Sequence, residues 1–162
     1  MLHPAAAHFA IALPIISLIL ALIYLLKPNE LMSKISSYFL VFGAVFIVAA
    51  YFTGKDDAKE VFEFLSSDAK ALLGQHAKLG QYLAISISIV AVIKFFGCLK
   101  KNVKIEVLAT VLLAVVTAAT FYQGKMGGEL TYNYGAHVQG YADGQACIKE
   151  AKEMEEDEDE EE

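Results

Sequence analysis

Four long apolar stretches limit what this chain can fold into. They cover residues 9–26, 35–52, 79–99 and 105–122, and the third is most apolar over residues 82–96. Each is close to the length of about 20 residues that a helix needs to cross the hydrocarbon core of a membrane. A soluble four-helix bundle would carry polar side chains at regular intervals on its outer faces, and these stretches have almost none. The sequence therefore predicts an all-α integral membrane four-helix bundle.

The first apolar stretch is expected to stay in the protein as a helix. A cleaved secretory leader has a basic region before its apolar run and small residues after it. Here the basic region is missing, and the small residues 5–7 precede the apolar run.

Charge is distributed unevenly between the body of the chain and its C-terminal tail. Residues 150–162 carry ten acidic side chains and only Lys152, so the rest of the chain has twelve lysines against nine acids. We expect a transmembrane domain over residues 1–142 and an acidic, disordered tail over residues 143–162.

Lysine placement predicts the orientation of the four spans. Residues 27–34 and 94–104 together hold six lysines and a single acid, Glu30, whereas the opposite connections mix lysines with acids. Short cytoplasmic loops are enriched in lysine and arginine. We therefore expect a multi-pass membrane protein with both termini outside.

An additional amphipathic helix is predicted at the outer face, between the second and third stretches. Asp57 and Glu60 have the spacing of a helix cap, and Gly74 is expected to end the segment before Gln75 and His76 open the third span. The apolar side chains after the cap recur on one face, as expected for a helix lying in the membrane interface; they are Val61, Phe62, Phe64, Leu65, Leu72 and Leu73. Gly127 and Gly128 are expected to form a tight turn after the fourth span.

All four histidines are predicted at the same membrane face. His3 and His8 lie at the start of the first span, His76 opens the third and His137 follows the fourth. Ionisable side chains near a span are rare, so their convergence suggests a site. His3 and His8 are five positions apart, about 140° around a helix, and cannot both point along one face unless His3 folds back.

Several segments resemble the bacterial "domain of unknown function 2231" family of predicted four-helix membrane proteins. They are His3-Pro-Ala-Ala-Ala-His-Phe9, Thr53-Gly-Lys-Asp-Asp-Ala58, His76, and Gly127-Gly-Glu-Leu-Thr-Tyr-Asn-Tyr-Gly-Ala-His-Val138. The resemblance covers roughly residues 2–138, and it implies that the membrane is a bacterial inner membrane. Some members of that family accompany cytochrome-c-type modules, which implies a redox setting by association.

Neutral imidazole binds haem iron, copper or zinc, and helical bundles supply facing ligands. For haem b the choice of ligands is His8 and His76, with Gly80 making room for the ring; His3 and His137 would then serve a second metal, a haem propionate or a quinone-like headgroup. For a transition metal, any of the four histidines is a candidate ligand. The alternative is that the histidines are ordinary interface residues of a non-catalytic structural or accessory subunit.

Partners and other function classes follow from the same features. The lipid bilayer is the first partner, a c-type cytochrome or another membrane subunit is a candidate, and Cys147 could link two copies of the chain. Nucleic-acid binding is disfavoured because the chain has no arginine and no basic stripe. No serine stands in a nucleophile motif, so we expect a redox carrier or an accessory subunit rather than an enzyme.

Overall fold

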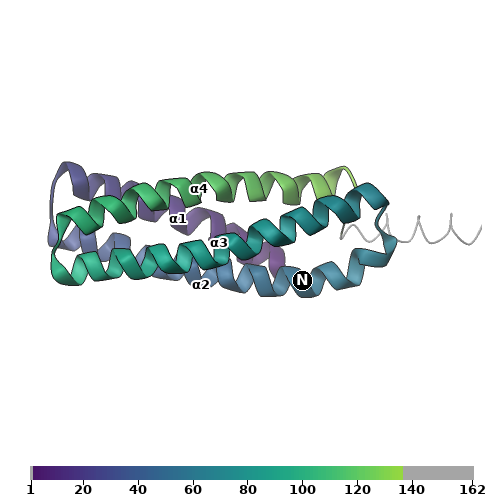
Figure 1. Cartoon of the computed structure of the whole chain (residues 1–162), viewed down its shortest axis with the longest axis horizontal. Coiled ribbons are helices and arrows are strands. Elements are labelled where there is room, and N and C mark those ends of the chain that lie inside the picture. Colours follow the sequence, from purple (N-terminus) through teal and green to yellow (C-terminus); the bar gives the residue numbers. More distant parts are fainter. Residues whose placement is uncertain (1, 137–162) are drawn as a thin grey trace, which may run out of the picture.

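The chain forms a bundle of four long α-helices in a computed structural model, which describes residues 2–136 (Figure 1). The helices are α1 (His3–Leu26), α2 (Glu30–Val61), α3 (Ser67–Lys100) and α4 (Val103–Tyr132), with a short 3-10 helix, η1 (Phe62–Phe64), after α2. Each α-helix is long and apolar enough to cross a membrane. The predicted all-α membrane bundle is confirmed. The predicted tail over residues 143–162 lies outside the described part of the chain.

Asparagine and serine side chains fix the starts of three helices. The side-chain oxygen of Asn29 accepts a hydrogen bond from Leu31 N at 2.7 Å, and that of Asn102 accepts one from Lys104 N at 3.0 Å. Ser66 does the same for the first turn of α3. Such caps satisfy amide groups that have no partner inside the helix. They allow very short connections, so α1 to α2 and α3 to α4 are tight antiparallel hairpins.

Both hairpins turn at the same end of the bundle, which we call the loop end (Figure 1). We call the opposite end, where α1 begins, the histidine end. With 24 residues α1 is about 36 Å long, whereas α3, with 34 residues, is about 51 Å long. Since a membrane's hydrocarbon core is about 30 Å thick, α2 and α3 extend past it at the histidine end, and α1 begins near its boundary.

The centre of the bundle is apolar and its outer surface is apolar as well. Leu40, Ile87 and Leu113 are completely buried between the helices. Outward-facing side chains such as Val92 and Val115 remain 69% and 65% exposed. A surface of this kind suits contact with lipid tails rather than water.

The predicted amphipathic interface helix is wrong. Instead, α2 continues without a break to Val61, and α3 begins at Ser67, so that Asp57 lies inside α2 and Gly74 and His76 inside α3. Part of this face packs against the end of α4 and the residues after it, in one cluster of Val61, Leu65, Leu72 and Leu73 with Leu130, Tyr134 and Ala136. Phe62 and Phe64 remain 49% and 55% exposed. An apolar helix face has the same periodicity whether protein or lipid covers it.

The glycine turn predicted after the fourth span is also displaced. Gly127 and Gly128 lie within α4, which continues to Tyr132. Gly135 follows the helix with a left-handed φ of 65°, and its backbone N donates a hydrogen bond to Thr131 O at 3.1 Å. This is the usual way in which a glycine ends a helix.

Candidate functional site at the histidine end

His3 reaches from the first turn of α1 onto α2. Its Nδ1 lies 2.8 Å from the carbonyl oxygen of Ala50, and its ring fills the space beside Gly54, where an added Cβ would lie 2.7 Å from Cε1. Because a carbonyl can only accept a hydrogen bond, Nδ1 carries the proton. In the neutral form of the ring, the lone pair is then on the other nitrogen, Nε2.

His76 lies in the third turn of α3 and faces α4. Its Cε1 is 3.3 Å from the position that a Cβ on Gly127 would take, so that glycine makes room for the ring. Its Nδ1 is buried and has no hydrogen-bond partner in the described part of the chain. A buried nitrogen without a partner costs free energy unless a water or an ion fills the role.

Gln123 of α4 completes the surroundings of His76. Its Nε2 donates a hydrogen bond to the backbone carbonyl of His76 at 2.9 Å, and its Oε1, like His76 Nδ1, is buried without a partner among the described residues. The same side chain fills the space beside Gly80, where an added Cβ would lie 3.1 Å from Nε2. Gly80 therefore makes room for the side chain of Gln123 in this structure. Sequence reasoning overlooked Gln123, although it is the only amide near the end of the fourth apolar stretch.

The structure brings together the rings of His3 and His76, from helices α1 and α3. Their centroids are 6.5 Å apart and their planes are nearly perpendicular, at 87°. Metals bind imidazole nitrogen at about 2 Å, so two rings that share one ion have centroids about 5–6.5 Å apart. The observed separation lies at the upper end of this range.

The other predicted site residues are placed differently. His8 is exposed, and its Nδ1 lies 2.6 Å from the carbonyl oxygen of Pro4 on its own helix. The ring that the structure places beside His76 is thus that of His3, and His8 with His76 stays an untested choice of ligands. His137 lies outside the described residues. Residues 2–136 contain no group of three or more histidine, cysteine, aspartate or glutamate side chains arranged to hold a metal.

A second polar cluster, at the loop end, was missed by sequence reasoning. Lys94 of α3 forms an ion pair with Glu106 of α4, and both side chains are almost completely buried. Ser33 Oγ donates a hydrogen bond of 2.5 Å to Glu106 Oε1, and the Lys94 ammonium lies 5.3 Å from the centre of the Tyr24 ring. From the sequence, Lys94 was expected among the loop lysines, but the structure places it inside the bundle.

The buried pair depends on a close approach of α3 and α4. An added Cβ on Gly97 would lie 3.0 Å from Ile105 and 3.2 Å from the backbone nitrogen of Glu106, so a larger residue would push the hairpin apart. Glu106 lies in the first turn of α4, where the positive end of the helix dipole favours a carboxylate.

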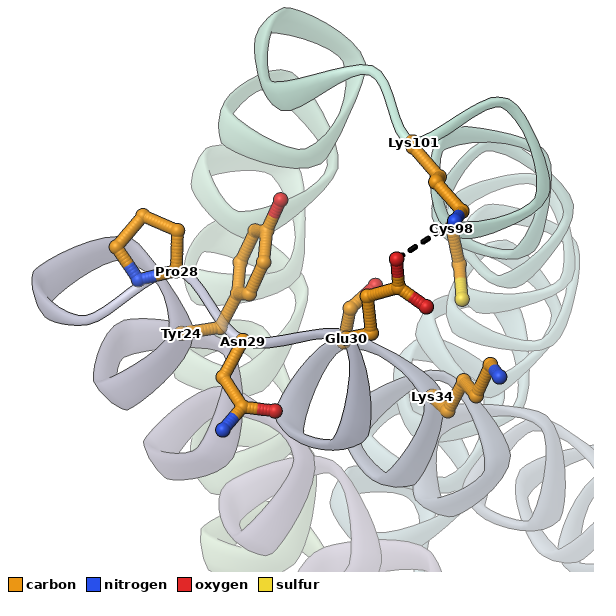
Figure 2. Close-up of a pocket in the computed structure, with 8 residues that line it drawn as sticks. Tyr24, Pro28, Asn29, Glu30, Lys34, Cys98 and Lys101 are labelled. Carbon is orange, nitrogen blue, oxygen red and sulfur yellow. Dashed lines mark hydrogen bonds and ion pairs between the residues drawn. The ribbon is translucent and has the colours of Figure 1, made fainter.

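A pocket opens at the loop end (Figure 2), and its lining shares Tyr24 and Ser33 with this cluster. Its volume is about 180 Å³, and it is lined by Tyr24, Pro28, Asn29, Glu30, Ser33, Lys34, Cys98 and Lys101. Glu30 and Lys101 form an exposed ion pair of 2.6 Å across it. The hydrogen bond from Lys101 to Glu30 raises the pKa of the Lys101 ammonium above its ordinary value, so this side chain stays charged at neutral pH.

Comparison with known proteins agrees with this architecture. The family described as "Predicted membrane protein (DUF2231)" matches residues 1–140. No curated protein and no solved structure matches the chain. Because the family match covers most of the chain and the structure has four helices able to span a membrane, the chain belongs to the DUF2231 family of predicted membrane proteins.

Proposed function

We propose that this membrane protein binds a transition metal ion between His3 and His76 and serves as an electron-transfer component. The observation that carries the proposal is the meeting of two imidazole rings, from helices far apart in the sequence, at the end of an apolar bundle. Ionisable side chains in such a place are expensive and are usually functional.

The hydrogen bonds of the two rings support metal binding. His3 donates its Nδ1 proton to a backbone carbonyl, as metal-binding histidines usually do, and so presents Nε2 as a ligand. His76 has a buried nitrogen that no described side chain satisfies. Each ring thus has one nitrogen that could serve as a metal ligand.

Copper and iron are the redox-active metals that imidazole ligands suit best. A single ion also fits better than haem b, because His3, Gln123 and His76 already fill the spaces beside Gly54, Gly80 and Gly127. The site lies where α1 begins, near the boundary of the hydrocarbon core, within reach of a c-type cytochrome or another membrane subunit.

The proposal is tested by titrating chelator-treated protein in detergent with Cu(I), Cu(II), Fe(II) and Zn(II). We expect saturable binding of one ion per chain for at least one of the redox-active metals. An absence of saturable binding for all of them would overturn the proposal.

Gly54→Ala should weaken metal binding without unfolding the bundle. The new Cβ would lie within 2.7 Å of the His3 ring, so the ring must move away from the site. We expect metal affinity to fall by roughly tenfold or more, as it does when the groups that orient a ligand are changed.

The matched control is Gly74→Ala, because nothing lies within 4 Å of the added Cβ. This control should bind metal as the natural chain does and be as stable or slightly more so, since alanine favours a helix over glycine. Equal metal affinities for Gly54→Ala and Gly74→Ala would show that metal binding does not depend on the position of the His3 ring.

The orientation is a separate prediction. With both termini outside a bacterial inner membrane, a thiol reagent that cannot cross the membrane should label Cys147 in intact cells and leave Cys98 unlabelled. Cys98 lines the pocket at the loop end, so it should react once the cytoplasmic face is opened. Labelling of Cys98 alone in intact cells would show the opposite orientation, with both termini inside.

A further inference from the structure

We propose that the pocket at the loop end binds the phosphate of an anionic phospholipid. The pocket lies where α1 and α3 end and α2 begins, with the α1 to α2 connection at its rim (Figure 2). Since all four spans end at this level, the pocket is at the depth of the lipid headgroups. Its volume of about 180 Å³ is enough for a phosphate and its ester oxygens.

The charge around the pocket is strongly positive. Residues 27–34 and 100–104 contain five exposed lysines and one exposed acid, Glu30, a net charge of +4. Two of the lysines, Lys34 and Lys101, line the pocket itself and come from different elements. Basic pockets between transmembrane helices are a recurrent form of binding site for anionic headgroups.

Neutral hydrogen-bond donors line the same pocket. Tyr24 brings a hydroxyl group, and Asn29 keeps its side-chain NH₂ because only its oxygen is used to cap α2. Beside the pocket, Leu26 and Leu31 are 82% and 58% exposed. Apolar side chains at the rim can accompany the acyl chains of a bound lipid, which a soluble phosphate does not have.

Glu30 opposes this binding, and its effect can be measured. Its carboxylate pairs with Lys101 at 2.6 Å and would repel a phosphate. Removing this negative charge should free Lys101 for the ligand. The proposal therefore predicts substitutions of opposite effect within the same pocket.

The experiment measures lipid retention by native mass spectrometry of the full chain. The protein is released from nanodiscs that contain phosphatidylglycerol and phosphatidylcholine in equal amounts. We expect preferential retention of phosphatidylglycerol, a loss of about tenfold in apparent affinity for the double variant Lys34→Gln/Lys101→Gln, and a gain for Glu30→Gln. The control Lys55→Gln/Lys59→Gln changes two lysines at the histidine end and should have no effect.

Competition with inorganic phosphate separates the two sources of the ligand. A lipid site should keep its phosphatidylglycerol in millimolar phosphate, because the acyl chains hold it. Equal retention of both lipids, equal loss in the pocket and control variants, or complete displacement by phosphate would overturn the proposal.

Discussion

Glu106→Ala is expected to lower the free energy of unfolding of the bundle by about 3–5 kcal/mol, because it leaves the Lys94 ammonium buried without its partner. Both side chains are almost completely buried, so water cannot take over the role of the lost carboxylate. Ser33 would lose its hydrogen-bond acceptor in the same variant. The measurement is reversible unfolding by a denaturing detergent, followed by circular dichroism.

The double variant Lys94→Met/Glu106→Leu distinguishes the effect of losing the ion pair from the effect of losing side-chain packing. Replacing both charges by apolar side chains of similar size is often neutral or stabilising, so this variant should recover most of the stability. An equally large loss in the single and double variants would mean that the charges are not what makes the position sensitive. An unchanged stability in Glu106→Ala would mean that the pair is not buried as described.

His76→Ala and His3→Ala should each reduce metal affinity by at least about 100-fold, if the proposed site is correct. Changing the groups around a metal ligand already costs about 10–100-fold, and removing a ligand should cost more. The bundle should still fold, because neither ring belongs to the fully buried core. Isothermal titration with the metal that the natural chain binds provides the measurement.

His8→Ala is the matched control for both variants. Its ring is also on α1, but it is exposed and bonded to its own helix. We expect the control to bind metal normally. A loss of metal affinity in His8→Ala, together with unchanged metal affinity in His3→Ala, would indicate that the ligands are His8 and His76.

Most of the fold could be predicted from the sequence because long apolar stretches have few alternatives to a membrane-spanning helix. The residues at which the helices end could not be predicted in the same way. The apolar face over residues 61–73 was assigned to lipid, whereas Leu130 and Ala136 pack against the part of it around Leu65. Gly127 and Gly128 were assigned to a turn, but within α4 they give room to neighbouring side chains, as Gly127 does for His76.

The candidate site was predicted in part. The convergence of His3 and His76 follows from the order of the spans, but the choice between His3 and His8 depends on the direction of each ring. Sequence spacing does not give that direction, because His3 folds back to the carbonyl of Ala50. The pair of Lys94 and Glu106 was missed because the two residues flank the α3 to α4 connection and look like loop charges in the sequence.

The most direct test of the proposed function is an absorption spectrum, oxidised and reduced, combined with metal analysis of protein gently extracted from its native membrane. The account predicts about one copper or iron ion per chain and no Soret band. A Soret band with reducible α and β bands would indicate that the cofactor is haem b and not a single ion. A colourless, metal-free protein that co-purifies with a larger complex would contradict the account and favour an accessory subunit.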